Sequence, residues 1–355
     1  MRRYVFMLNA THEGYGGLEH QNSCALECAR ADLPRDNESQ PALRTGYQKL
    51  LGVISHEYFH AWLVKRLRPA ELIPYDYQRE NYTGLLWLFE GFTAYYDDLL
   101  LYRAGLISRE AYFRLLEYTL QRSQRTPGRF VHSPAQASFE TWTKYYHPTP
   151  DSDNLTASYY MQGALTALCF DLTLRRDYKK STDDLLRDLW RRVENGRLTE
   201  GDVAQSLQRL TGRSWAKEIA TWVHGTGELP HEALLNAHGV EVRRDRMAGV
   251  AQSLGLTVGD DRRVIDVRSV RADSCAAKAG FAPGDEWLGI VGTQAWRITS
   301  PEDLLCYGRT RRVTALVSRD RRLLHLPLEL PSELLSLPTL AAGNEPAAGR
   351  WPDAL

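Results

Sequence analysis

The chain has 355 residues, and its 44 Lys and Arg side chains balance 44 Asp and Glu side chains. This balance excludes a global basic field, and with it nucleic acid or anionic lipid as the main partner. We find no run of about eighteen uncharged apolar residues, so we predict no membrane span. With 43% hydrophobic and 25% charged residues, the composition is typical of a globular protein of two or three domains.

The five cysteines are scattered and include no Cys-x-x-Cys pair, so a disulfide framework and a structural zinc site are both disfavoured. The N-terminal segment, MRRYVFMLNATHEGYGG, lacks the apolar core of a secretory signal. We therefore expect a reducing compartment and a cytoplasmic protein.

The first two parts of the chain differ in pattern. Residues 1–45 form a β segment, with a strand-like run at Tyr4–Leu8 and a glycine-rich turn at 14–17. Residues 46–238 follow with the three- and four-residue spacing of apolar side chains that predicts helices. This spacing is found first at Tyr47–Ala61 and Leu85–Leu99. Further helices are expected near 109–123, 157–176, 182–194, 200–211 and 214–224.

From about residue 239 the pattern changes to short strands. Strands are expected at 264–267, 287–290 and 313–317, separated by Gly, Asp and Pro turns, within a β domain at 239–331. Residues 332–355 are rich in Ala, Gly and Pro and are predicted to be disordered. The pattern as a whole predicts an α+β protein, in which a mostly helical domain lies between two β-rich segments.

The strongest chemical signal is the sequence His56-Glu57-Tyr58-Phe59-His60. Two histidines four residues apart lie on one face of a helix, so both imidazoles can reach one metal ion. Glu57 lies beside that face and can act as general base toward water. By chance such a pattern arises in roughly one or two chains per hundred of this length, so a helix with two ordinary histidines is the alternative.

A third ligand is expected because a catalytic zinc ion uses three protein ligands and leaves one position open. Glu90 stands in the otherwise apolar segment Trp87–Tyr96, where a carboxylate is rarely buried unless it is paired or coordinates a metal. Glu80 is nearer to His60 in the chain but belongs to a polar loop. We therefore favour Glu90 over Glu80, and predict one Zn²⁺ per chain held by His56, His60 and Glu90.

These residues resemble the glycyl aminopeptidase family of gluzincin zinc metallopeptidases, whose members carry a C-terminal PDZ domain. The resemblance rests on HEYFHAWLVKRLRP and ENYTGLLWLFEGFTAYYDDLLLYRAGLI, and it extends over about residues 1–330. The Trp-Leu-x-Glu-Gly-Phe segment is also similar to the aminopeptidase N and leukotriene A4 hydrolase family, where that glutamate is the third zinc ligand. The resemblance implies a thermolysin-like domain at 46–238 and a PDZ-like domain at 239–331. Family members also have a β-rich N-terminal domain, which we expect to be missing here.

Two further segments match related aminopeptidases. Ser158–Gly163 resembles a Tyr-x-Lys-Gly element whose tyrosine stabilises the oxyanion, and the matching residue is Tyr160, with glutamine in place of the lysine. The alternative is that Tyr160 only packs on a buried helix. The segment GGLEH resembles a Gly-x-Met-Glu-Asn strand, which implies that Gly16 and Gly17 approach the substrate backbone and that Glu19 holds its α-amine.

In the C-terminal region, the segments 254–256 and Cys275–Asp285 resemble a PDZ domain. The resemblance implies that the loop at Leu254, Gly255 and Leu256 receives a peptide carboxylate on its backbone N–H groups, beside an edge strand that the peptide can extend. A docking domain without a peptide ligand is the alternative.

The sequence therefore predicts an enzyme, a zinc metallo-aminopeptidase that removes N-terminal residues from peptides through a metal-activated water. Glu57 would take the proton of that water, Tyr160 would stabilise the oxyanion and Glu19 would select a free N-terminus. The family implies a preference for Gly or Ala. The alternative is an inactive or truncated remnant that acts as a PDZ peptide-binding protein. The expected partners are peptides with a free N-terminus and a peptide C-terminus at the PDZ domain.

Overall fold

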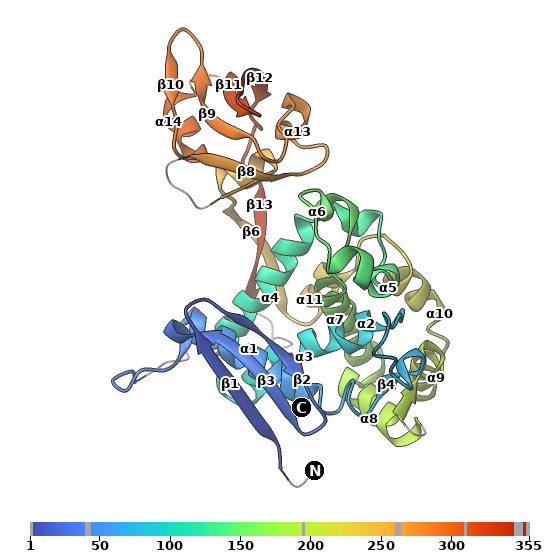
Figure 1. Ribbon diagram of the computed structural model, residues 1–355. Helices are drawn as coiled ribbons and strands as arrows, with labels where there is room; N and C mark the ends of the chain where they lie inside the picture. The colour runs from blue at the N-terminus through green and yellow to red at the C-terminus, as the bar shows by residue number, and fades with distance from the viewer. Residues whose placement is uncertain are drawn as a thin grey trace.

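The computed structural model describes residues 3–39, 44–193, 196–259, 264–308, 311–343 and 351–352. A small sheet, a helical body and a β-rich lobe follow one another along the chain (Figure 1). Within the described residues, we find no helix with both the length and the apolar character needed to cross a bilayer.

The N-terminal sheet has three strands in the order β1-β3-β2. Its strands are β1 (Val5–Thr11), β2 (Tyr15–Glu19) and β3 (Ser23–Ala29). Side chains alternate across a strand, so Cys24, Leu26 and Cys28 share one face of β3, and they pack with Leu50 and Val53 of the first helix. This packing places β2, an edge strand, across the helix that carries His56 and His60.

The helical body is built around one central helix. Its helices are α1 (Thr45–Phe59), α2 (Leu86–Phe89), α3 (Gly91–Arg103), α4 (Arg109–Gln124), α5 (Pro134–Phe139), α6 (Ser152–Leu155), α7 (Tyr159–Tyr178), α8 (Thr182–Arg192), α9 (Glu200–Thr211), α10 (Ala216–Glu218) and α11 (His231–Ala237). Residues 162–174 of α7 are all buried, as expected for a helix that is covered on every side. Short strands β4 (Arg68–Pro69) and β5 (Arg197–Leu198) pair with each other.

Serine and threonine side chains set where the long helices begin. Ser108, Ser158, Ser181 and Thr199 each accept a hydrogen bond from a backbone N–H of the helix that follows, and so cap α4, α7, α8 and α9. The helices predicted at 109–123, 157–176, 182–194 and 200–211 are confirmed by these elements.

Two glycines let α7 approach α2 and α3 at backbone distance. A Cβ atom at Gly163 would lie 2.5 Å from the carbonyl oxygen of Trp87, and one at Gly91 would lie 2.4 Å from the Cα of Gly163. A larger residue would push the helices apart. Because Glu90 precedes Gly91 and Tyr160 lies one turn before Gly163, this contact also brings those two side chains to the same region.

The C-terminal lobe has its own hydrophobic core, centred on the fully buried Trp287. Its elements are α12 (Val250–Leu254), β7 (Leu256–Val258), β8 (Ile265–Val270), α13 (Cys275–Ala279), β9 (Glu286–Val291), β10 (Ala295–Arg297), α14 (Leu304–Tyr307), β11 (Arg312–Arg319) and β12 (Arg322–Glu329). The sheet order is β12-β11-β9-β8-β7, which makes β7 an edge strand. The strands expected in this region are confirmed as β8, β9 and β11, and the mixed helix and strand content agrees with the predicted class.

An antiparallel ribbon of β6 (Val240–Met247) and β13 (Ser336–Ala342) connects this lobe to the helical body (Figure 1). The prediction of disorder over 332–355 is therefore wrong for Ser336–Ala342. Strand β13 is ordered by its pairing with β6 and by α4, where the Glu117 carboxylate accepts a hydrogen bond from the N–H of Leu340 at 2.7 Å. Further on, Trp351 is 1% exposed and stacks on Phe113 of α4.

Candidate active site

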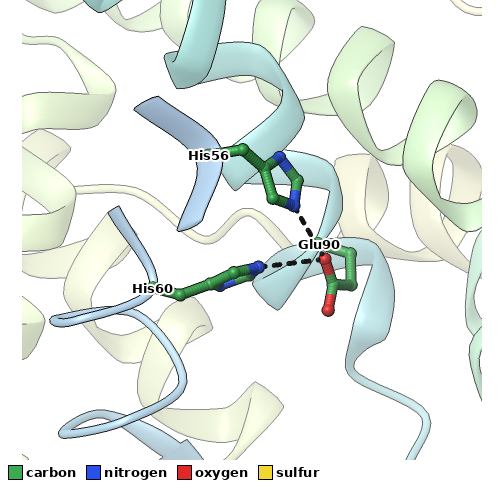
Figure 2. A group of neighbouring side chains, drawn as sticks. All are labelled: His56, His60 and Glu90. Carbon is green, nitrogen blue, oxygen red and sulfur yellow. Dashed lines mark hydrogen bonds and ion pairs between the residues drawn. The ribbon is translucent and has the colours of Figure 1, made fainter. Parts of the chain in front are cut away.

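His56, His60 and Glu90 meet at one point (Figure 2). His56 Nε2 lies 3.3 Å and His60 Nε2 lies 3.2 Å from the same oxygen, Oε2 of Glu90. The two histidines come from the last turn of α1 and its C-terminal cap, and Glu90 stands at the junction of α2 and α3. Residues from two separate segments thus direct two nitrogens and one oxygen toward a common centre.

The Nδ1 atoms of the two histidines each have a hydrogen-bond partner on the side away from Glu90. His60 Nδ1 lies 2.9 Å from the carbonyl oxygen of Leu63, which can only accept, so Nδ1 carries the proton and Nε2 presents a lone pair when the ring is neutral. His56 Nδ1 lies 3.0 Å from Oδ2 of Asp97. Hydrogen bonds of this kind orient histidines that bind a metal ion.

The nearby carboxylates make the electrostatic potential at this centre negative. Burial lowers the pKa of His56, but the carboxylates of Asp97 and Glu90 outweigh it and raise that pKa to about 10. The same field attracts a metal cation. Two imidazole nitrogens and one carboxylate oxygen, buried or partly buried and within 4.8 Å of one another, are a donor set that suits zinc.

Glu57 lies next to this centre and is 5% exposed. Its Oε2 atom has no hydrogen-bond partner among the described residues, and burial raises the pKa of the carboxyl group. Strand β2 passes directly over it, because a Cβ atom at Gly17 would lie 2.3 Å from Cγ and Oε1 of Glu57. A buried carboxylate without a partner is costly unless it has a task, and here it faces the strand predicted to bind substrate.

Tyr160 reaches the centre from the first turn of α7. Its ring centroid lies 6.1 Å from that of His56, and burial holds the pKa of the hydroxyl well above 10, so the group stays a donor. Gln162, at the position of the family's lysine, is buried and donates from Nε2 to Oγ of Ser123 at 2.7 Å. It links α7 to α4 and is directed into the body.

Glu19 already has a cationic partner. Nζ of Lys65 lies 2.9 Å from Oε1 of Glu19, and the two side chains are 22% and 20% exposed. Lys65 follows Val64, whose φ of 108° is an uncommon conformation for a β-branched residue. A substrate ammonium that binds Glu19 therefore has to share the carboxylate with Lys65.

Glu80, Gly16 and the segment 254–256 are not part of the metal centre. Glu80 is exposed, and its neighbour Arg79 pairs with Asp76 at 2.9 Å. A Cβ atom at Gly16 of β2 would meet nothing within 4 Å, so there is open space above the strand at that point. The segment 254–256 lies in the C-terminal lobe, where Gly255 ends α12 with a φ of 85° and Leu256 begins β7.

Sequence reasoning missed Asp97 and Lys65. A signal for Asp97 was available, because it follows Glu90 by seven residues, or two helical turns, and so lies on the same face of α3. Lys65 follows α1 in a loop whose course depends on the strained backbone at Val64. Nothing in the spacing of the sequence predicts where that loop directs its side chains.

Comparisons with known proteins identify a similar family and a similar structure. Residues 49–166 match the family model described as M61 glycyl aminopeptidase. Among solved structures, an aminopeptidase N family protein from Idiomarina loihiensis is similar, with a TM-score of 0.90 and 30% sequence identity. The similarity covers 99% of this chain but 62% of that one, so the present chain spans about three-fifths of its length. A search of curated proteins found no match. The family match and the structural similarity confirm the predicted resemblance: residues 49–166 of this chain are similar to the glycyl aminopeptidases, and the chain as a whole is similar to an aminopeptidase N family protein.

Proposed function

We propose that this chain is a zinc-dependent aminopeptidase that removes N-terminal residues, Gly or Ala by preference, from peptides. The observation that carries the proposal is the convergence of His56, His60 and Glu90 beside the buried Glu57, whose Oε2 atom has no hydrogen-bond partner among the described residues. The family relationship supports peptide bonds as the target. The preference for Gly or Ala comes from the family resemblance alone.

The residues of the centre have different roles in the proposed reaction. His56, His60 and Glu90 would hold the ion, and zinc bound there would supply a Lewis acid next to the scissile carbonyl. Glu57 takes a proton from the attacking water and later delivers it to the leaving amine. Tyr160, which stays protonated, donates to the oxygen on which negative charge develops.

Strand β2 provides a binding surface for the peptide substrate. It is an edge strand, so an extended peptide can pair with its free backbone groups. Gly17 lies against Glu57, which brings the paired substrate close to the base. Glu19, at the end of β2, is then positioned to bind the substrate's α-ammonium together with Lys65, and peptides with a free N-terminus are the expected partners.

Metal content and turnover of the purified chain test the proposal together. We expect one zinc ion per chain, hydrolysis of glycyl or alanyl anilides, and loss of that hydrolysis on treatment with a chelator. Glu57→Gln is the control that separates binding from chemistry. It should retain zinc but lose at least about a hundredfold in kcat, the lower end expected for a positioned base. A chain with neither zinc nor turnover would contradict the proposal.

A second candidate function is peptide binding by the C-terminal lobe without turnover. It is favoured by the free edge of β7, which follows the Gly255 turn, because a peptide C-terminus could extend the sheet there. A zinc-free, inactive chain that binds C-terminal peptides would support this alternative.

A further inference from the structure

A cavity of about 320 Å³ lies between the helical body and the C-terminal lobe. One wall comes from the end of α4 and the region of α6, and the other from α12, β7 and β8. None of the residues of the candidate metal centre lines it. Its volume is in the range of small-molecule sites, so the cavity could hold more than ordered water.

Three arginines line the cavity: Arg122 and Arg125 on the helical side, and Arg271 on the side of the lobe. Arg125 and Arg271 are partly buried, whereas Arg122 is exposed. Among the described residues none of the three forms an ion pair. Within the described parts of the chain, the one hydrogen bond of these guanidinium groups runs from Nε of Arg125 to the carbonyl oxygen of Gln121, in its own helix, at 3.2 Å.

Two other partly buried arginines, by contrast, are paired. Arg103 lies 3.1 Å from Asp183, and Arg175 lies 2.7 Å from Asp171. The C-terminal end of a helix stabilises nearby cations, and this accounts in part for Arg122 and Arg125. It does not account for Arg271, which belongs to the opposite lobe.

Arg271 is held in this position from the helical side. The side chain of Asn154 donates to the carbonyl oxygen of Val270 at 2.8 Å and accepts from the N–H of Ala272 at 2.8 Å. These two bonds fix the residues on either side of Arg271 against the helical body. They also keep its positive charge opposite Arg122 and Arg125.

The lining therefore has an excess of positive charge. Burial, followed by the charge of Arg122, lowers the pKa of Arg125, and the charge of Arg271 adds to this effect. Burial also lowers the pKa of Arg271. Asp153 is the acidic residue of the lining, and it offsets one of the three guanidinium charges. Among the described residues of the lining, two positive charges remain without a counter-charge.

We propose that this cavity binds one small oxyanion with two or more negative charges, clamped by Arg122 and Arg125 from the helical body and by Arg271 from the lobe. Planar guanidinium groups form paired hydrogen bonds with phosphate and carboxylate oxygens, so both chemistries fit the lining. A ligand of this charge neutralises the excess. Because it contacts both parts of the molecule, it also joins the lobe to the helical body at this point.

Titration calorimetry on the full chain tests the proposal, with inorganic phosphate, pyrophosphate and citrate as ligands at constant ionic strength. We expect saturable binding of one ligand per chain and a rise in melting temperature on its addition. Preference for phosphate or pyrophosphate would identify phosphate chemistry, and preference for citrate would identify carboxylate chemistry. Absence of saturable binding for all three would overturn the proposal.

Matched arginine variants localise the binding. Arg122→Gln and Arg271→Gln should each weaken it by roughly 10- to 100-fold, the loss expected for a charge-assisted pair of hydrogen bonds. Arg271→Lys, which keeps the charge but not the planar group, should fall between wild type and Arg271→Gln. Arg114→Gln on α4 and Arg268→Gln on β8 lie outside the lining and should leave the affinity unchanged. Equal losses in the lining variants and these two controls would show a bulk charge effect and refute the site. Circular dichroism checks that each variant is folded.

Discussion

At the scale of single residues, substitution of Glu90 tests whether this carboxylate is the third zinc ligand. Glu90→Gln should lose most bound zinc, because a neutral amide is a poor ligand and two strong donors remain. The matched control is Glu80→Gln, which changes an exposed carboxylate and should keep the metal. Metal analysis of the two purified variants is the measurement. Zinc retained in the Glu90 variant but lost from the Glu80 variant would reverse the ligand assignment.

Substitution of Glu19 tests how the proposed enzyme selects peptides with a free N-terminus. A charge-assisted bond to the substrate ammonium contributes about 1.5–3 kcal/mol, so Glu19→Gln should lower kcat/KM by roughly 10- to 150-fold on free-amine substrates. N-acetylated peptides have no ammonium to bind, and they should be poor substrates for wild type and hardly worse for the variant.

Steady-state kinetics on both substrate types decides between two roles of Glu19. Equal losses on free and acetylated substrates would mean that Glu19 is structural. In that case its carboxylate serves to hold Lys65.

The contrast between Glu90 and Glu19 shows how far the sequence predicts the candidate site. The histidine spacing and a lone carboxylate in an apolar segment are local patterns, and the structure brings those three residues together. The Lys65–Glu19 pair joins the loop after α1 to β2 across 46 positions of the chain. A contact of that kind depends on loop conformation, which spacing does not encode.

At the scale of elements, the contact of Gly163 with α2 and α3 sets the position of Glu90. Gly163→Ala places a methyl group 2.5 Å from the Trp87 carbonyl oxygen and should separate the helices. We expect a loss of about 1–3 kcal/mol in the free energy of unfolding, as for other overpacked interiors, together with weaker zinc binding.

Gly201→Ala in α9 is the matched control, because its nearest neighbour, Thr199 Oγ1, lies at an ordinary 3.5 Å. It should be neutral or stabilise the chain by up to about 1 kcal/mol. Chemical denaturation and zinc titration measure both effects. A Gly163 variant as stable as the Gly201 variant would show that the helices do not need this close contact.

The helices and strands also differ in how well the sequence predicts them. Helices with an apolar repeat and a serine or threonine cap are predictable to within a few residues, because both signals are local. Strand β13 was missed because its partner, β6, lies about ninety residues earlier in the chain. The Ala- and Pro-rich composition indicated disorder, whereas pairing and burial of Leu337 and Leu340 determine the structure.

At the scale of the whole molecule, His231 links stability to pH. Burial lowers its pKa, and Nδ1 has no hydrogen-bond partner among the described residues. Its folded-state pKa is thus below the unfolded value of about 6.5, and the unfolded chain takes up the proton first as pH falls. His231 therefore makes the native state less stable with each step below about pH 6.5, by at most about 1.4 kcal/mol per pH unit.

Denaturation at several pH values measures this effect as a difference between wild type and His231→Gln. The free energy of unfolding of wild type, relative to the variant, should fall between pH 7 and pH 5. Taking the difference removes the contributions of all other titrating groups. Parallel pH dependences in the two proteins would show that burial of His231 does not control acid stability.

Composition and periodicity predict the order of the three parts along the chain but not how they are joined. The cavity between the helical body and the lobe depends on two hydrogen bonds of Asn154 to residues more than a hundred positions away. Such contacts arise only once both parts have folded. For this reason the three arginines give no recognisable motif in the sequence.

The ribbon of β6 and β13 has a consequence for topology. Val240 and Ala342 are register partners at the end of the ribbon that joins the helical body, and Met247 and Ser336 pair at the end that joins the lobe, so the chain enters and leaves the lobe at the same place. The C-terminal lobe is thus an insertion at the tip of a long hairpin, and the body is completed only after the chain returns. Truncation near His238 would remove β13 and the buried Trp351 from the body. Excision of 248–335 with a two-residue turn in their place would leave the body's core intact.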